Sequence, residues 1–304
     1  MRTITKVDKS TLPEGIFFMR TTIYLCLLSI LLFTTGCVKL NCPLPENLDK
    51  AVTKVPLSSS SDAPDLKRNS WSMGDLCANR ISFYDKGQKW NLLLVRNTKK
   101  PQGPFWYLPH DNENSALDAA VYATNKYGGG FLSVEASGKR YASGKDPNRQ
   151  FKRSSKYTKN IFKIIDTFKR KEMPYLTLHS NKEGHERNGG DGTVSMKVSS
   201  SRTKSYPAGR IDVGKKEGLK DEDNLIYLAG KKTDRQQIKA LNDIGVHVKY
   251  ELVTKGSNDN SMSNYVALNK SSKTYVNIES EDGDTGTQKE MIDKVMKLIY
   301  KGVL

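Results

Sequence analysis

The sequence is poor in features that mark several classes of protein. Cysteine and histidine are scarce, with four of each among 304 residues. The apolar stretch at residues 23–33 is shorter than the ~20 residues of a helix that spans a bilayer. The glycines at residues 189–192 lack a strand and a helix at the spacing of a phosphate-binding loop, so they predict a turn. The basic residues are scattered and not interleaved with aromatic ones, which argues against nucleic acid as a partner.

Acidic residues are outnumbered as well. The chain has 49 Lys and Arg against 33 Asp and Glu, a formal net charge of +16. Such a charge favours anionic surroundings, for example lipid headgroups or acidic cell-wall polymers. A lysine-rich, solvated surface without such a partner explains the same balance. The apolar content of 37% and the charged content of 27% fit one large globular domain preceded by a leader.

Residues 1–36 predict a secretory leader in which translation starts at Met19. A short basic start is followed by an apolar core of the length of a signal-peptide h-region. The core closes on a small residue directly before Cys37, which resembles a bacterial lipobox. The resemblance implies that Cys37 is lipidated, and that the protein is anchored to a bacterial membrane and faces the periplasm. Because Thr34 stands where leucine is usual, the alternative is an ordinary leader or an N-terminal anchor, with an incidental cysteine.

Residues 37–69 predict a flexible tether between the membrane and the domain. Four prolines and a run of four serines interrupt this segment, a composition typical of linkers. The domain itself is then expected over residues 70–304. Two cysteines remain near this boundary, Cys42 and Cys77. They could pair in an oxidising periplasm, or they could be two unrelated thiols.

Apolar runs and amphipathic segments alternate through the domain. This alternation predicts an α/β fold with a mixed central sheet and helices on both faces. Residues 182–222 are polar and predict a long surface excursion that could overhang a site. We expect strands at residues 80–84, 90–95, 105–108, 131–135, 174–179, 225–228, 246–252, 263–268 and 275–278. We expect helices at residues 115–127, 158–171, 234–243 and 287–301.

Polar side chains stand at the carboxyl ends of three predicted strands, where ligands gather in α/β sheets. His110 and Glu113 follow the run at residues 105–108, and His179 ends a second run. Glu279 ends a third. Imidazole and carboxylate both suit zinc, and a catalytic zinc takes three protein ligands and leaves one position open. The plainer alternative is a pair of strand-end histidines bonded to backbone, with Glu279 in an exposed acidic turn.

In this order, the His-x-x-Glu motif at residues 110–113, an Asn-Arg pair, a strand-end histidine and a late strand-end glutamate resemble the zinc carboxypeptidase superfamily. That superfamily includes carboxypeptidases and the related amidohydrolases that deacylate amino acids. The resemblance implies a carboxypeptidase-like fold, a bound zinc ion and a set of site roles. It implies His110, Glu113 and His179 as zinc ligands, Glu279 as general base, Asn148 and Arg149 as the grip on a substrate carboxylate, and Arg140 near the oxyanion.

The resemblance leaves one position of the family without a clear match. No tyrosine can be assigned to the mobile position on the substrate side, and Tyr250 and Tyr265 are both candidates. His185 and His247 are interpreted as incidental.

From these residues we expect a monomeric zinc-dependent hydrolase. It would cleave an amide bond near a free carboxylate in a peptide, a peptidoglycan stem peptide or an acyl amino acid. The alternative is a non-catalytic lipoprotein that uses the same fold and its basic surface to bind anionic wall or lipid polymers.

Overall fold

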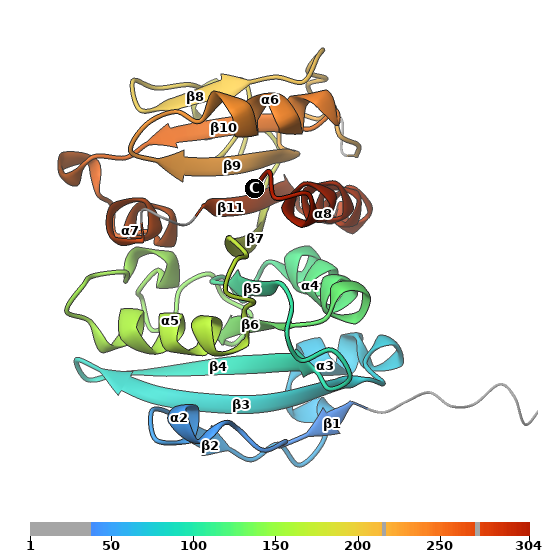
Figure 1. Ribbon diagram of the computed structural model, residues 1–304, viewed down its shortest axis with the longest axis vertical. Coiled ribbons are helices and arrows are strands. Elements are labelled where there is room, and N and C mark those ends of the chain that lie inside the picture. Colours follow the sequence, from blue (N-terminus) through green and yellow to red (C-terminus); the bar gives the residue numbers. More distant parts are fainter. Residues whose placement is uncertain (1–37, 215–216, 271–273) are drawn as a thin grey trace, which may run out of the picture. The chain divides into compact units, whose positions relative to one another are not determined.

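The computed structural model describes residues 38–214, 217–270 and 274–304. In these residues, one mixed sheet of eleven strands runs through the domain in the order β1-β3-β4-β6-β5-β7-β11-β9-β10-β8, with β2 paired to β3 (Figure 1). The strands are β1 (Lys39–Leu40), β2 (Thr53–Val55), β3 (Leu76–Asp85), β4 (Gln88–Asn97), β5 (Phe105–Leu108), β6 (Gly130–Glu135), β7 (Tyr175–Asn181), β8 (Thr203–Tyr206), β9 (Leu225–Gly230), β10 (His247–Leu252) and β11 (Tyr275–Glu281).

The centre of the sheet is parallel, and the strand next to it on each side runs antiparallel to it. β6, β5, β7 and β11 are parallel neighbours, whereas β4 pairs antiparallel with β6 and β9 pairs antiparallel with β11. The carboxyl ends of β5, β7 and β11 therefore meet at one edge of the sheet. The central strands are buried throughout, as expected for strands covered on both faces.

Helices cover both faces of the sheet, which confirms the predicted fold class. On one face lie α3 (Pro64–Arg68), α4 (Asn114–Tyr127), α6 (Arg235–Asp243) and α8 (Thr285–Tyr300). On the other lie α2 (Glu46–Asp49), α5 (Lys156–Phe168) and α7 (Met262–Asn269). In Figure 1, α4 and α8 stand to the right of the strands, and α5 and α7 to the left.

The helices form where their sequences supply a cap and an apolar face. Ser155 precedes α5, and its side chain accepts a hydrogen bond from the backbone nitrogen of Thr158. Phe162 and Ile165 lie on its buried stripe. α4 carries small residues against the sheet and so can pack closely on it. Its fully buried alanines are Ala116, Ala119, Ala120 and Ala123.

The predicted tether at residues 37–69 is wrong for its described part, residues 38–69. This segment packs on the domain: β1 pairs parallel with β3, and β2 pairs antiparallel with it. Leu48 is 1% exposed and Leu66 is fully buried. A disulfide joins Cys42 to Cys77 of β3, with their Cα atoms 6.3 Å apart. Several prolines and serines here precede or open short elements, as Pro45 does for α2 and Pro64 for α3, and apolar residues of the segment reach the core.

A second correction concerns residues 263–268, which were expected to form a strand. They lie in α7, where Ser261 caps the helix by accepting a hydrogen bond from the backbone nitrogen of Asn264. Met262 and Val266 are buried at helical spacing, one turn apart. The short apolar run fits both periods, and the cap decides between them.

The excursion, residues 182–222, contributes one element to the sheet. Its strand β8 pairs antiparallel with β10 at the end of the strand order. The predicted leader and its lipidation candidate Cys37 lie outside the described residues. Within the described part of the chain, no helix is both long enough and apolar enough to cross a membrane.

Candidate metal centre

Three of the predicted site residues converge at the carboxyl ends of β5 and β7. Nδ1 of His110 lies 2.6 Å from Oε1 of Glu113, and Nδ1 of His179 lies 3.2 Å from Oε2 of the same carboxylate. One potential ligand atom from each residue lies within 4.8 Å of the other two. All three side chains are buried. Two imidazoles and a carboxylate in this arrangement can hold a metal ion.

Backbone contacts fix where these side chains lie. Glu113 stands at the position before α4, so the start of that helix carries it. Its Oε2 accepts a hydrogen bond from the backbone nitrogen of Ser180 at 3.1 Å, which ties this helix start to β7. The carbonyl of His179 accepts a hydrogen bond of 2.8 Å from Nε2 of Gln288 on α8. The sheet and two helices therefore position the cluster, and no long loop is involved.

The electrostatics of the cluster favour an ionised carboxylate between two imidazoles. Burial opposes the charged form of Glu113, but His179 and His110 outweigh it and hold the pKa of this carboxyl well below its usual range. Burial likewise opposes the charged form of His110, yet Glu113 and Asp146 together raise its pKa. An ionised carboxylate flanked by two imidazoles offers electron pairs to a cation.

Asp146 is a residue of the site that the sequence did not reveal. Its Oδ1 lies 3.1 Å from Nε2 of His110, on the ring nitrogen that does not face Glu113. A histidine that binds metal through one nitrogen usually has a carboxylate or carbonyl at the other, which fixes the ring and its tautomer. Asp146 lies 36 residues along the chain from His110, so only the fold brings them together.

Glu279 lies beside the cluster on the next strand. It is the register partner of His179 in the parallel β7–β11 pair, and it is 7% exposed. Burial raises the pKa of its carboxyl, and the charge of Glu113 adds to this against the opposing effect of His179. Nδ2 of Asn277 donates to its Oε1 at 2.7 Å. The side chain is thus held next to the centre without being one of its three convergent groups.

Arg140 also reaches the centre. Its Nη1 donates to Oε1 of Glu113 at 3.1 Å. The guanidinium therefore contacts a potential metal ligand and remains partly exposed. The structure brings Arg140 to the site, and its role near an oxyanion stays a prediction.

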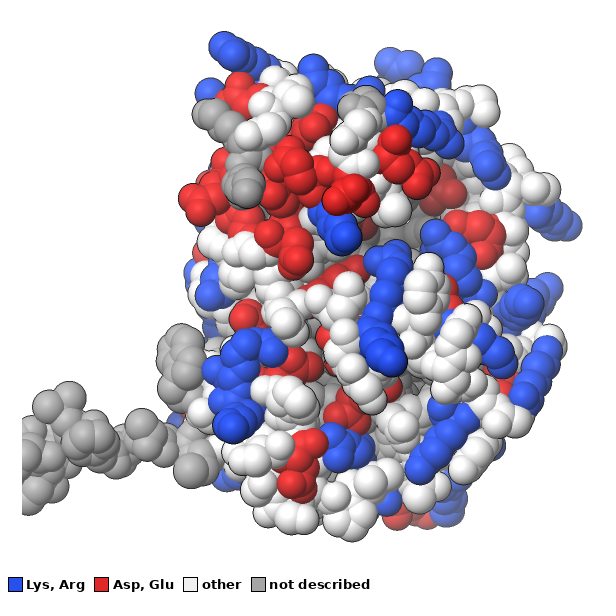
Figure 2. All heavy atoms as spheres, turned by 180° about the vertical axis from the view of Figure 1, so that it is seen from behind, with Lys and Arg blue, Asp and Glu red and all other residues white. Residues whose placement is uncertain are grey.

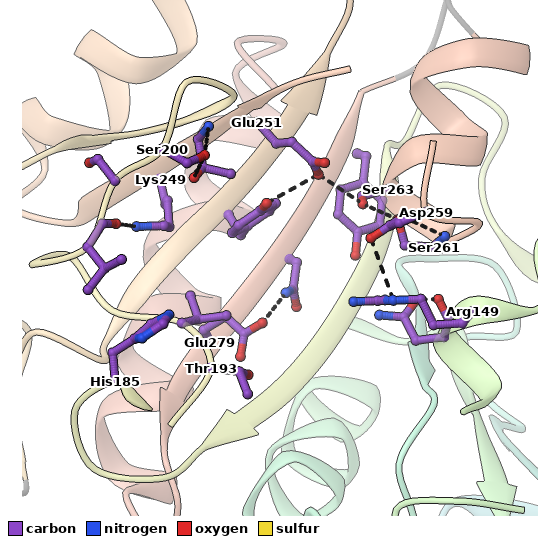
Figure 3. A pocket seen from close by; sticks show the side chains of 18 of the residues that line it. Arg149, His185, Thr193, Ser200, Lys249, Glu251, Asp259, Ser261, Ser263 and Glu279 are labelled. Carbon is purple, nitrogen blue, oxygen red and sulfur yellow. Dashed lines mark hydrogen bonds and ion pairs between the residues drawn. The ribbon is translucent and has the colours of Figure 1, made fainter. Parts of the chain in front are cut away.

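A cavity of about 270 Å³ opens beside Glu279. Figure 3 shows Arg149 and Asp259 on one side of this cavity and His185 and Lys249 on the other, with Glu279 between them. The three convergent residues of the centre are not among the described residues that line it. Glu279 belongs to both places, because it lines the cavity and neighbours His179.

Asn148 and Arg149 both line the cavity. They lie in the short 3₁₀ helix η3 (Pro147–Arg149). Oδ1 of Asn148 accepts a hydrogen bond of 3.2 Å from the backbone nitrogen of Met262, so its side chain fixes η3 to the start of α7. Arg149 is half exposed, and its Nε lies 3.5 Å from Oδ2 of Asp259. The guanidinium is therefore available to an anion that enters the cavity.

The excursion forms much of the opposite wall, and sequence reasoning missed its residues. His185 was interpreted as incidental, but it lines the cavity and its Nδ1 accepts a hydrogen bond from the backbone nitrogen of Arg187. Lys249 of β10 holds the same wall, since its Nζ donates to the carbonyls of Ser195 and Val198. Polarity alone predicted the overhang but could not indicate which residues turn inward.

The two tyrosines considered for the substrate side are placed elsewhere. The hydroxyl of Tyr250 donates to the carbonyl of Lys232 at 2.7 Å, and the ring of Tyr265 packs on Phe162 at 4.9 Å between centroids. Neither is among the described residues that line the cavity, whereas Tyr227 and Tyr275 are.

Neither a protein-family model nor a curated protein matches this chain in sequence. Solved structures to which it is similar include a putative metallopeptidase from Shewanella denitrificans OS217, at 10% identity and a TM-score of 0.40, covering 80% of this chain and 88% of that one. Another is an aspartoacylase family protein from Mesorhizobium loti, at 13% identity and a TM-score of 0.39, covering 75% and 67%. A third is a putative carboxypeptidase A from Shewanella denitrificans OS-217, at 10% identity and a TM-score of 0.35. The match covers 71% of this chain and 61% of that one.

At such low identities and TM-scores, the argument for function rests on the residues of this chain.

Proposed function

We propose that the protein is a zinc-dependent hydrolase that cleaves an amide bond next to a free carboxylate. The substrate class is a peptide, a peptidoglycan stem peptide or an acyl amino acid. The observation that carries the proposal is the convergence of His110, Glu113 and His179 within 4.8 Å beside the buried carboxylate of Glu279.

Zinc fits the residues that converge. Two imidazole nitrogens and a carboxylate are the ligand set of one common class of catalytic zinc site, which leaves one coordination position open. The contact between Asp146 and Nε2 of His110 supplies the support that such a ligand needs. When bound, zinc provides Lewis-acid chemistry, polarising a carbonyl group and making water more acidic.

Glu279 is the general base of the proposed reaction. Its carboxylate lies beside His179 and is not itself among the convergent groups, so it can take a proton from water and deliver it to the leaving amine. Burial raises its pKa toward the range in which a carboxylate exchanges protons efficiently.

Arg149 is the group that recognises the free carboxylate of the substrate. A planar guanidinium binds a carboxylate through two parallel hydrogen bonds. Arg149 lines the same cavity as Glu279, so a bound carboxylate and the scissile bond would lie in one space. A cavity of about 270 Å³ suits a single amino-acid side chain better than a folded polypeptide.

We also propose that the chain is a monomeric lipoprotein held to a bacterial membrane through Cys37 and facing the periplasm. The leader pattern supports this placement. The Cys42–Cys77 disulfide supports it as well, because disulfides persist in oxidising compartments.

The test combines metal analysis with a substrate screen. Purified residues 37–304 should contain about one zinc ion per chain and hydrolyse muramyl peptides or acylated amino acids with a free terminal carboxylate. The same substrates with an amidated terminus should react poorly. A folded, zinc-loaded protein without activity on either class, whose binding to anionic wall polymers is unaffected by Glu279→Gln, would contradict catalysis and favour the binding lipoprotein.

A further inference from the structure

A second group of acidic side chains lies where the two ends of the excursion meet. Glu183 stands at the start of this segment, Asp221 and Glu222 stand at its end, and Asp223 follows directly. One carboxylate oxygen each from Glu183, Glu222 and Asp223 lies within 4.8 Å of the other two. Figure 2 shows that acidic side chains gather in one area of the face it presents, although the chain as a whole is strongly basic.

Three of these four residues are buried, and their carboxylates have no counter-charge. Asp221 and Asp223 are fully buried, and Glu222 is 2% exposed. In the described part of the chain, no Lys, Arg or His forms an ion pair with any of the four. Buried charges are normally paired or bound to metal, because removing an isolated carboxylate from water is costly. The missing partner is therefore a positive charge.

Two oxygen atoms of the group are also left without a hydrogen bond. Oδ2 of Asp221 and Oε2 of Glu183 are buried and have no partner among the described residues. The charges of Glu183 and Glu222 both act on Asp221, so its carboxylate lies near the same group. A cation among these oxygens would satisfy the two free atoms and relieve the repulsion.

The other oxygens are held in place by the excursion itself. Oδ2 of Asp223 accepts a hydrogen bond of 2.6 Å from the backbone nitrogen of Gly184. Oε2 of Glu222 accepts one of 2.9 Å from the hydroxyl of Ser195. The arrangement is therefore fixed before any ion binds, which reduces the entropy cost of binding.

We propose that Glu183, Glu222 and Asp223, assisted by Asp221, bind one divalent cation and that this cation is calcium. An all-oxygen, acidic ligand set suits a hard cation, and calcium accepts irregular geometry where magnesium requires a regular octahedron. The ion links the two ends of the excursion, because its ligands come from the first and the last residues of that segment. The wall formed by His185 and Thr193 lies between these two ends, so the ion stabilises one side of the cavity.

Calcium binding to the zinc-loaded protein, measured by isothermal titration calorimetry, tests the proposal. We expect one calcium ion per chain with a Kd in the ~10⁻⁶ to 10⁻³ M range. A 100-fold excess over Kd should raise the Tm by several degrees, on the order of 5 °C. Asp223→Asn should weaken binding at least tenfold, and Glu222→Gln provides a second variant should the first fail to fold. The exposed Glu186→Gln, nearby on the same segment, should bind as the wild type does.

Three outcomes would overturn the proposal. One is the absence of calcium binding up to ~10 mM, far above the range of such sites. The second is binding that Asp223→Asn and Glu222→Gln both leave unchanged. The third is binding that His179→Ala abolishes, because the ion would then occupy the first centre. Since calcium binding is read without any substrate, it can succeed even if the proposed hydrolysis fails.

Discussion

His179 of β7 and Glu279 of β11 are register partners in two adjacent parallel strands. Their side chains therefore leave the same face of the sheet next to each other. The distance between a potential metal ligand and the proposed base is thus set by backbone hydrogen bonds within the sheet. Loop movements in the excursion can change access to the pair without changing its spacing.

Removal of one convergent histidine should empty the centre. In His179→Ala the cluster keeps only one imidazole and one carboxylate, and three protein ligands are the norm for catalytic zinc. We expect zinc content, measured by inductively coupled plasma mass spectrometry, to fall from about one per chain to near zero.

His247→Ala is the matched control. His247 is equally buried, but its Nδ1 accepts a hydrogen bond from the backbone nitrogen of Ala208, away from the centre. This variant should lose about 1 kcal/mol of stability with the hydrogen bond and keep its zinc. Equal zinc content in the two variants would count against the centre.

Glu279→Gln should separate chemistry from metal binding. The substitution keeps the size of the side chain and removes its ability to accept a proton. We expect kcat to fall by about 10²–10⁴-fold, the usual contribution of a general base, while zinc content stays the same. Glu290→Gln on the exposed face of α8 changes the net charge equally and should leave kcat unchanged. A kcat of Glu279→Gln within threefold of the wild type would remove Glu279 from the mechanism.

Arg149 and Asp259 should have opposite effects on substrate binding. Arg149→Ala should raise KM for free-carboxylate substrates about 10–100-fold, in line with a lost charge-assisted pair of ~1.5–3 kcal/mol. Asp259→Asn should lower KM, because Oδ2 of Asp259 lies 3.5 Å from the guanidinium and competes with the substrate. With amidated substrates both effects should disappear, and their persistence would show that Arg149 acts on something other than the carboxylate.

Lys249 should make stability depend on pH in the alkaline range. Burial lowers its pKa to about 8 from an ordinary value near 10.5. Between these values the unfolded chain binds more protons at this residue than the folded one, so stability rises with pH across that window. From pH 8 to pH 10, we expect the unfolding free energy of the wild type to rise by about 1–3 kcal/mol relative to that of Lys249→Met. Parallel pH curves for the two proteins would contradict the shift.

The disulfide between Cys42 and Cys77 should stabilise the whole domain, although it lies near the start of the described chain. It closes a loop of 35 residues, for which the chain-entropy relation gives between about 3 and 5 kcal/mol. The double variant Cys42→Ser, Cys77→Ser should unfold at correspondingly lower denaturant and expose residues 38–57 to proteases first. The wild type treated with a reducing agent should show the same fall in the denaturant midpoint as the double variant. If neither treatment changes the unfolding midpoint, the segment is held by packing alone.

Much of the fold and the cluster of His110, Glu113 and His179 could be predicted from the sequence. The reason is that the ends of buried strands can be recognised in the sequence. An apolar run that stops at a histidine indicates both the strand and the residue at which it ends. Parallel pairing then brings such residues together whatever their separation along the chain.

The failures have physical causes of their own. Asp146 and Asp259 act through contacts made across the fold, and neither belongs to a repeating pattern. Residues 263–268 fit two periods, and only the cap at Ser261 separates them. The segment before residue 70 has a composition typical of linkers, because each of its short elements buries at most one side chain.

The pairing of β1 with β3 limits how far the domain could move from a membrane. Thirty residues of free chain would extend up to ~100 Å, enough for an anchored enzyme to search a thick layer of cell wall. Here β1 already starts at Lys39, two positions after the candidate lipidation site. An acylated Cys37 would then hold the domain near the lipid headgroups by the edge of the sheet where β1, β3 and β6 begin, and the metal centre lies at the opposite edge, where β5 and β7 end.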